Sequence, residues 1–132
     1  MVDDYAHHPT EVLATLEAAR TLNPRRLVAV FQPHLFSRTA RTAAEFGHAL
    51  ALADEIVVLD VYPARERAED FPGVDGLLVA RAAADAAGGR TVAWTPDLAA
   101  AEDYLRPRLR EGDLVITLSA GDVDALGKAL LR

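Results

Sequence analysis

The feature that most constrains the fold of this 132-residue chain is a regular alternation of short apolar runs with longer amphipathic segments. Four of the runs are rich in β-branched residues and have almost no polar interruption, which is typical of parallel strands covered by helices on both faces. They lie at residues 27–31, 56–59, 91–94 and 114–118, and residues 2–5 resemble the tail of a fifth strand. We therefore expect an α/β fold: an open, mainly parallel sheet with helices on both faces, in a Rossmann-like three-layer sandwich.

Apolar residues recur at helical spacing in the segments between these runs. Proline suits the first helical turn, serine suits the position before it, and glycine suits the residue after the last turn. A proline inside a helix ends or kinks it. From these signals we expect helices from Pro9 onward, behind a cap at Ser37, over residues 76–87 before Gly88-Gly89, from Thr95-Pro96-Asp97 to Pro107, and over residues 123–130.

Length and composition indicate one globular domain over residues 1–132. Hydrophobic residues make up 51% of the chain and charged residues 26%, which is an ordinary balance for a folded protein. The net charge of −6 lacks the basic footprint of a nucleic-acid binder, and no apolar run is long enough for a membrane span. The absence of cysteine excludes disulfides and cysteine nucleophiles, and fits a cytoplasmic protein.

The chain also lacks the common motifs of nucleotide binding and nucleophilic catalysis. It has no Gly-x-x-x-x-Gly-Lys-Ser/Thr phosphate loop, no Gly-x-Gly-x-x-Gly fingerprint and no Gly-x-Ser-x-Gly elbow. We therefore expect no catalytic residue on this domain alone. Strand-like sequence begins at once, so we also expect the chain to be part of a longer protein.

Unusual polar clusters lie directly behind the predicted strands. Because the carboxyl ends of parallel strands meet at one edge, where open α/β sheets bind their ligands, these clusters should form a single rim. Histidine, arginine, aspartate and tyrosine side chains in such a rim suit an anionic ligand, whereas the loops at the opposite edge look plain. The four clusters are residues 4–9, 32–38, 60–66 and 119–122.

Each cluster also has a purely structural interpretation. Asp4 alone is equally suited to capping the first helix or pairing with a neighbouring cation. His7 and His8 with Asp4 would resemble a metal site, but adjacent histidines on a turn diverge, so we expect no metal here. Arg65 lies in a charged stretch that is typical of a solvated loop. Residues 119–122 resemble a turn that offers N–H groups to an anion at a helix start.

Together the clusters resemble the C-terminal domain of the Mur ligases, in the same order and across nearly the whole chain. The most specific match resembles the signature of the branch that adds L-alanine to UDP-N-acetylmuramate, and it is Asp3-Asp4-Tyr5-Ala6-His7-His8-Pro9-Thr10-Glu11. The other matches are Phe31-Gln32-Pro33-His34 with Ser37-Arg38-Thr39, then Asp60-Val61-Tyr62-Pro63-Ala64-Arg65-Glu66, and last Ala120-Gly121-Asp122.

The resemblance implies a parent enzyme of three domains: one for the uridine nucleotide, a central ATPase domain, and this one. It implies that the enzyme uses ATP and Mg²⁺ to join L-alanine to UDP-N-acetylmuramate in peptidoglycan precursor synthesis. An acyl phosphate would form on the sugar carboxylate, and the amine of alanine would displace the phosphate. The C-terminal domain would close over the ATP and help to position the amino acid, while the Mg²⁺ ligands would lie on the central domain.

Carried over residue by residue, the resemblance implies two groups of contacts. Asp4 would accept hydrogen bonds from the ribose hydroxyls, and Tyr5 would lie near both the nucleotide and the alanine. His7 and His34 would line the amino-acid pocket, and the guanidinium of Arg38 would bind both oxygens of the alanine carboxylate. The rim residues expected to support these contacts are His8, Gln32, Arg65, Gly121 and Asp122.

Two positions depart from the family pattern. Leu35 stands where many relatives have a second arginine, which leaves more of the carboxylate binding to Arg38, and Ser119 stands where glycine is usual. Two alternatives remain open. One is a related ligase that recycles muropeptides by adding a tripeptide, although the intact run at residues 31–34 favours the alanine enzyme. The other is a non-catalytic α/β module that binds an anionic metabolite.

Overall fold

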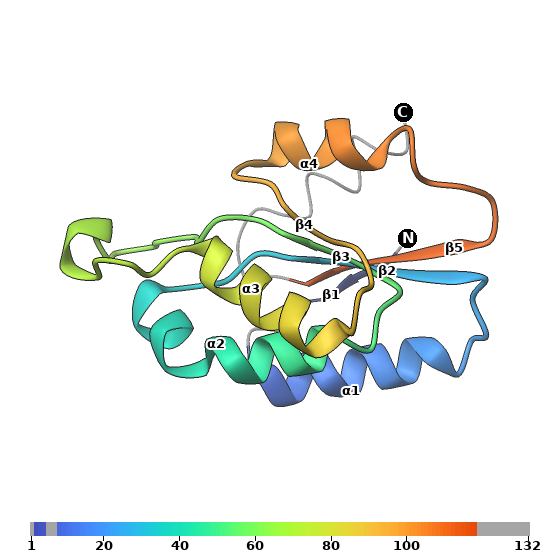
Figure 1. Ribbon diagram of the computed structural model, residues 1–132, viewed down its shortest axis with the longest axis horizontal. Helices are drawn as coiled ribbons and strands as arrows, with labels where there is room; N and C mark the ends of the chain where they lie inside the picture. Colours follow the sequence, from blue (N-terminus) through green and yellow to red (C-terminus); the bar gives the residue numbers. More distant parts are fainter. Residues whose placement is uncertain (1, 5–7, 119–132) are drawn as a thin grey trace.

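The computed structural model describes residues 2–4 and 8–118 of the chain. Its centre is a five-stranded, all-parallel sheet in the order β1-β5-β2-β3-β4 (Figure 1). The five predicted strand segments are confirmed, with small shifts at their ends. The strands are β1 (Val2–Asp4), β2 (Arg26–Phe31), β3 (Glu55–Val58), β4 (Val92–Trp94) and β5 (Asp113–Leu118).

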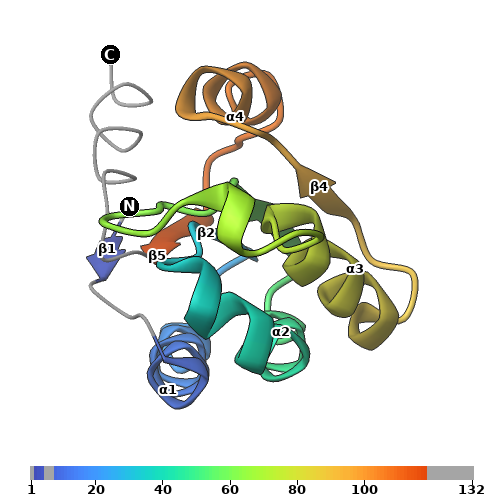
Figure 2. The same ribbon diagram turned by 90° about the vertical axis from the view of Figure 1, so that its left-hand side faces the viewer.

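Helices cover both faces of the sheet. Figure 2 shows α1, α2 and α3 on one face and α4 on the other, which confirms the expected three-layer α/β sandwich. Within the described residues no helix is both long and apolar enough to cross a membrane. The helix predicted over residues 123–130 lies outside the described part of the chain. The helices are α1 (Pro9–Arg20), α2 (Phe36–Leu50), α3 (Gly76–Ala87) and α4 (Leu98–Leu105), with a short 3₁₀ helix η1 (Ala68–Asp70) after β3.

Strand β2 joins the two halves of the core because its successive side chains point to opposite faces. Leu27, Ala29 and Phe31 pack into the cluster shared with α1, α2 and α3. Val28 and Val30 pack into the cluster on the side of α4. All five side chains are buried. Burial on both faces explains why this strand is a continuous apolar run rather than an alternating one.

The strand registers bring the carboxyl ends of the sheet level with one another. Leu118 of β5 lies opposite Asp4 of β1 on one side and Phe31 of β2 on the other. Phe31 in turn lies opposite Val58, and Val58 lies opposite Trp94. The loops that follow these residues therefore all begin at the carboxyl edge of the sheet, so they can form one shared rim.

Most of the predicted helix ends are also confirmed. Helix α1 begins at Pro9, and α3 is followed by Gly88 in the left-handed conformation with φ of 61°. Asp97 caps α4 by accepting the N–H of Ala100 at 2.8 Å. This helix ends shortly before Pro107, which could not continue it.

The prediction that Ser37 caps α2 is wrong. The helix begins at Phe36, and its cap is Leu35, whose backbone has φ of 72° and ψ of 132° and whose side chain makes no capping hydrogen bond. Ser37 instead lies within the first turn and donates its hydroxyl to Glu66, which follows β3. A serine near a helix start suggests a local cap, but here its partner comes from a different loop.

Gly47 sets the spacing between α2 and α3. A Cβ at this position would lie 2.5 Å from the Cβ and the carbonyl carbon of Ala82, and 2.6 Å from the backbone nitrogen of Ala83. These atoms belong to a helix backbone and cannot move aside cheaply. The close approach of the two helices therefore requires glycine.

We expect Gly47→Ala to destabilise the fold by about 1–3 kcal/mol, because the added methyl group overpacks the contact between α2 and α3. In a helix without such a contact the same substitution would stabilise by up to about 1 kcal/mol, so the sign of the change is diagnostic. Urea unfolding measures it. Ala40 is exposed on the same helix, and Ala40→Leu should change stability by less than about 0.5 kcal/mol. A neutral or stabilising Gly47→Ala would contradict this account of the packing.

Candidate functional site

The loops after β2 and β3 are hydrogen-bonded to each other at the carboxyl edge of the sheet. The backbones of His34 and Tyr62 form a parallel bridge beyond the ends of the two strands. The N–H of Leu35 donates to the carbonyl of Tyr62 at 2.9 Å, and the N–H of Tyr62 donates to the carbonyl of Pro33 at 2.8 Å. The sheet pairing thus continues into the loops, and it fixes one loop against the other.

His34 and Arg38 contact each other within this pair of loops. Nη1 of Arg38 lies 3.2 Å from Nδ1 of His34. A guanidinium can only donate, so Nδ1 accepts this hydrogen bond and the ring proton of His34 lies on Nε2. The imidazole stacks on the ring of Tyr62, with the centroids 5.7 Å apart and 17° between the planes. The contact uses one N–H of Arg38 and leaves the rest of the guanidinium fork for other acceptors.

Leu35 makes the turn between the β2 loop and α2 in a strained conformation. Its φ of 72° is uncommon for a residue with a Cβ, and such a backbone typically costs about 1–3 kcal/mol. Its carbonyl accepts both the N–H of Thr39 at 3.1 Å and the hydroxyl of the same residue at 2.8 Å. With the bond from its N–H to Tyr62, Leu35 is held on both sides. The strained turn therefore connects His34 directly to the helical turn that carries Arg38.

Glu66 anchors the first turn of α2 from the loop after β3. Its Oε1 accepts the N–H of Ser37 at 3.0 Å, and its Oε2 accepts the hydroxyl of Ser37 at 2.5 Å. Burial pushes the pKa of Glu66 up, but the hydrogen bonds from Ser37 and from the N–H of Phe36 outweigh it, and the pKa is lowered. The group is therefore a charged carboxylate at neutral pH.

A cavity of about 380 Å³ opens at the same edge, between the loop after β3 and the start of α4. Asp60 is one of its walls, and its carboxylate accepts the N–H groups of Val61 and Gly76, each at 2.9 Å. A Cβ on Gly76 would lie 2.2 Å from the carbonyl oxygen of Leu59, so this approach requires glycine. Asp60 thus fastens the start of α3 to the end of β3. The cavity is lined by Gln32, Leu59, Asp60, Val61, Tyr62, Pro63, Pro96, Asp97, Leu98 and Ala99.

The structure brings part of the predicted site together at this edge. Gln32, His34 and Arg38 belong to one continuous segment behind β2, and Gln32 is buried there. The backbone of Asp4 ends β1 level with the same edge. Four other predicted site residues lie outside the described part of the chain, namely Tyr5, His7, Gly121 and Asp122.

Two of the predicted supporting residues are exposed, and two members of the 60–66 cluster, Tyr62 and Glu66, make contacts that the sequence analysis did not predict. His8 is exposed and donates its N–H to Glu11 at 3.1 Å, which caps α1, and Arg65 is exposed in the loop after β3. The described residues contain no group of three or more His, Asp or Glu side chains suited to a metal ion. The contacts of Tyr62 and Glu66 give no local sequence signal, because their partners lie in the loop after β2.

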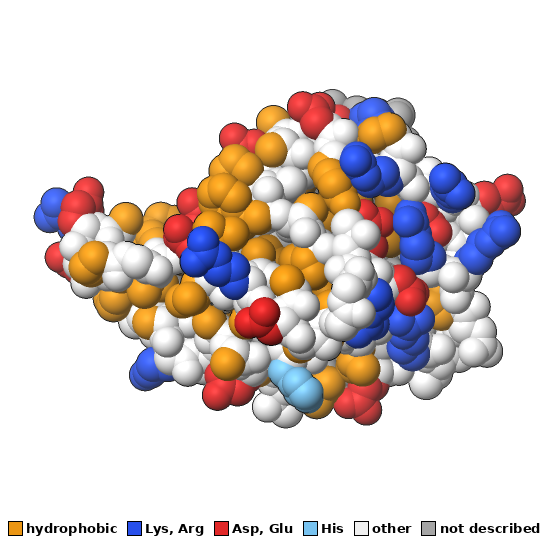
Figure 3. All heavy atoms as spheres, in the orientation of Figure 1, with side chains coloured by type: hydrophobic (Ala, Val, Ile, Leu, Met, Phe, Trp, Pro, Cys, Tyr) orange, Lys and Arg blue, Asp and Glu red, His pale blue; other side chains and the backbone are white. Residues whose placement is uncertain are grey.

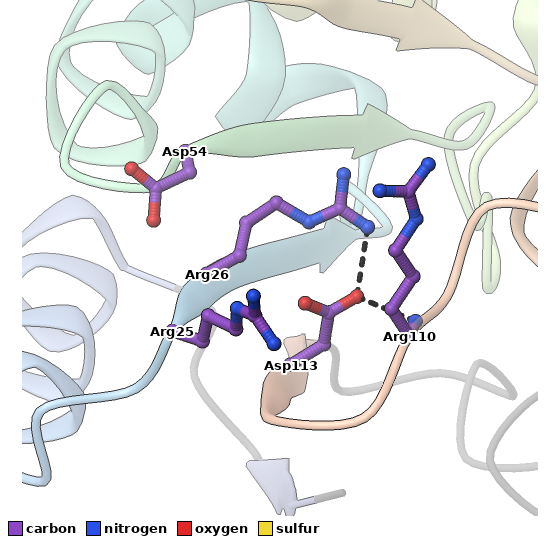
Figure 4. Close-up of a pocket in the computed structure, with 5 residues that line it drawn as sticks. All are labelled: Arg25, Arg26, Asp54, Arg110 and Asp113. Carbon is purple, nitrogen blue, oxygen red and sulfur yellow. Dashed lines mark hydrogen bonds and ion pairs between the residues drawn. The ribbon is translucent and has the colours of Figure 1, made fainter.

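The opposite edge of the sheet is not plain, contrary to expectation. A cavity of about 630 Å³ lies where β2 and β5 begin (Figure 4). Figure 3 shows basic side chains gathered toward this end of the molecule. The cavity is lined by Arg25, Arg26, Asp54, Arg110 and Asp113.

The carboxylates of this cavity are paired with arginines and backbone N–H groups. Asp113 accepts from the guanidinium of Arg26 and from the N–H of Arg110, each at 2.8 Å (Figure 4). Asp54 accepts from Arg20 at 3.0 Å and from a backbone N–H of β2 at 2.7 Å. Burial raises the pKa of both carboxyls, but the hydrogen bonds from arginine side chains and backbone N–H groups, together with the nearby arginine charges, outweigh it, and the pKa of each is lowered. The network ties β5, β2, the end of α1 and the segment directly before β3 together at the amino edge.

Glu55, at the start of β3, extends this network into the core. Its side chain is buried, lies 3.0 Å from Arg26, and accepts the hydroxyl of Tyr104 at 2.6 Å. Burial, and then the hydrogen bond to the charged Glu55, raise the pKa of Tyr104 to about 12. Helix α4 is in this way fastened to the sheet by a phenol that must stay protonated.

We expect Tyr104 to titrate near pH 12 rather than at the ordinary value of 10.0. The folded-state pKa is raised, so the stabilisation is complete below pH 10 and is lost as the pH rises toward 12. Tyrosinate absorbance measures the titration, and Tyr104→Phe should remove its step near pH 12 while Tyr62→Phe should not. A wild-type titration without a step near pH 12 would rule this network out.

Comparison with known proteins gives the family to which this fold belongs. The family model for the Mur ligase, glutamate ligase domain matches residues 1–121. The chain therefore belongs to the Mur ligase family, as its motifs indicate. Within that family it is similar to proteins named UDP-N-acetylmuramate–L-alanine ligase. That of Kineococcus radiotolerans is 56% identical over 133 residues, and that of Chlorobaculum parvum is 53% identical over 127 residues.

These relatives are much longer than this chain. The two alignments cover 100% and 96% of this chain but 27% of each relative. A crystal structure of UDP-N-acetylmuramate-alanine ligase from Thermotoga maritima has a TM-score of 0.74 at 25% identity, and covers 97% of this chain and 25% of that chain. A murein peptide ligase from Psychrobacter arcticus also has a TM-score of 0.74, at 20% identity, covering 97% of this chain and 26% of that chain, which shows a shared fold.

Proposed function

We propose that this chain is the C-terminal domain of a cytoplasmic, ATP-dependent ligase that joins L-alanine to UDP-N-acetylmuramate in peptidoglycan precursor synthesis. The observation that carries the proposal is the His34–Arg38 pair on the carboxyl edge, in a chain 56% and 53% identical to ligases of that name. Because the chain spans 27% of those relatives, we propose that a uridine-nucleotide domain and a central ATPase domain complete the enzyme.

In this proposal the chain contributes recognition, and the phosphoryl chemistry belongs to the central domain. The carboxylate of UDP-N-acetylmuramate attacks the γ-phosphate of ATP to give an acyl phosphate and ADP. The amine of L-alanine then attacks the acyl carbon, and phosphate leaves as the amide forms. As the family resemblance implies, we assign the Mg²⁺ ligands to the central domain and no catalytic residue to this domain.

Arg38 binds the carboxylate of L-alanine in this proposal. Its bond to His34 holds the guanidinium in place and leaves a planar fork that matches two carboxylate oxygens. Leu35 carries no charge, so Arg38 is the main cationic contact. His34 lines the same pocket, and His7 lines it as well.

We place the nucleoside contacts at Asp4 and Tyr5. Asp4 ends β1 level with Phe31, on the edge that would close over ATP. An ionised carboxylate there accepts the ribose hydroxyls, and Tyr5 contacts both the nucleotide and the alanine. The supporting rim residues of the proposal are His8, Gln32, Arg65, Gly121 and Asp122.

Arg38→Ala in the full-length enzyme should reduce kcat/KM for L-alanine by about thirtyfold to several thousandfold. Loss of a charge-assisted pair in a closed site costs about 2–5 kcal/mol, and each 1.4 kcal/mol is about tenfold. Arg38→Lys should recover part of the loss, because an ammonium cannot make the two-pronged contact. Steady-state kinetics with each substrate in turn measure the effect.

The Michaelis constants for ATP and UDP-N-acetylmuramate should change much less, and so should thermal stability. Arg41 is exposed on the same helix, so Arg41→Ala is the matched control and should keep normal kinetics. Near-normal efficiency of Arg38→Ala toward alanine would refute the assignment. If the wild-type enzyme prefers a tripeptide over L-alanine, the recycling ligase replaces this proposal.

The 132-residue chain alone should neither hydrolyse ATP nor form an amide bond, and should bind ATP at about millimolar Kd or weaker. Half of an interdomain site makes few contacts, and each lost 1.4 kcal/mol raises Kd about tenfold. Phosphate release and calorimetry test the two expectations. Tight, stoichiometric ATP binding would instead favour the non-catalytic binding module.

A further inference from the structure

We infer that Glu66 is a positioning residue for the amino-acid site: its carboxylate holds the first turn of α2 and so fixes the direction of Arg38. The inference rests on the role proposed for Arg38. The hydrogen bonds of Glu66 that support it do not depend on that role. Both carboxylate oxygens of Glu66 bind one residue, Ser37, through its N–H and its hydroxyl. Ser37 directly precedes Arg38 in the chain.

The start of α2 needs a partner of this kind. The first N–H groups of a helix have no acceptor within the helix, and the positive end of the helix favours a negative charge. The first turn of α2 contains no acidic residue, and the cap residue Leu35 has no side chain that could accept. Glu66 reaches the helix from the loop after β3 and supplies the missing carboxylate. Hydrogen bonds from Ser37 and Phe36 lower its pKa against the effect of burial, which keeps the group ionised.

The loop that contains Glu66 contacts both ends of the segment from His34 to Ser37. At one end Tyr62 pairs with the backbone of His34 and stacks on its ring. At the other end Glu66 binds Ser37. The strained turn at Leu35 lies between these two contacts, so both of them oppose relaxation of its backbone. Loss of the hydrogen bonds between Glu66 and Ser37 would allow the start of α2 to move. The guanidinium of Arg38, which now contacts His34, would move with it.

Glu66 acts on the site through Ser37 and Arg38 rather than by contact with substrate. Its two oxygens already bind Ser37. The expected signature is therefore a defect in alanine recognition that depends on the presence of Arg38. A general loss of folding would instead affect every substrate and would not depend on Arg38.

The test uses the full-length ligase and a double-mutant cycle. Glu66→Ala should raise KM for L-alanine about ten- to a hundredfold, since small misplacement of a binding group costs that much, and should leave KM for ATP nearly unchanged. Glu66→Gln retains one acceptor oxygen and should give an intermediate value. In the Arg38→Ala background Glu66→Ala should have little further effect. Glu69 is exposed and pairs with Arg67, so Glu69→Ala is the control with normal kinetics.

Hydrogen exchange of the same proteins separates this inference from the proposed function. Glu66→Ala should speed exchange in residues 36–39 and leave the rest of α2 protected, whether or not the enzyme ligates alanine. If exchange in that segment is unchanged, or if the two substitutions act on alanine independently, Glu66 has no positioning role. If exchange rises but the wild-type enzyme does not use alanine, Glu66 does hold the first turn of α2 and the proposed function is wrong.

Discussion

Burial of β2 on both faces is the constraint on which the remaining structure depends. A shift of one residue in its pairing would exchange Leu27 and Phe31 with Val28 and Val30 between two differently shaped halves of the core. The register with β3 and β5 is therefore fixed by packing, and it sets the level at which each strand ends. The contact between the loops after β2 and β3 follows from this level, because their first residues leave the sheet side by side.

The two edges of the sheet use arginine in different ways. At the amino edge Arg26 binds Asp113 and Glu55, so its charge is neutralised within the fold and serves stability. At the carboxyl edge Arg38 contacts the neutral Nδ1 of His34. A neutral acceptor orients a guanidinium without cancelling its charge, and leaves that charge for an anionic ligand. In the function that we propose, this difference in partner gives Arg26 a structural role and Arg38 a binding role.

The sequence predicted those features that depend on local spacing. The strands, the start of α1 at Pro9 and the end of α3 at Gly88 follow from apolar periodicity and from single-residue conformational preferences. The position of His34 and Arg38 behind a predicted strand also indicated that they follow β2 at the carboxyl edge of the sheet. Sequence reasoning missed the cap of α2, because the positive φ of Leu35 is imposed by hydrogen bonds to another loop.

The same limit applies to the contacts between distant segments. Glu66 is separated from Ser37 by a helix and a strand, so no spacing rule connects them. The network of Glu55 and Tyr104 likewise joins β3 to α4, and their roles emerge only when the sheet and α4 are packed together.

The left-handed backbone at Leu35 bears on which side chains this position accepts. Strain at positive φ arises at Cβ, so it would be nearly the same for arginine as it is for leucine. Glycine would release the strain together with the fixed geometry. An exchange of leucine for arginine at this position would therefore add a positive charge to the carboxyl edge of the sheet without rebuilding the loop.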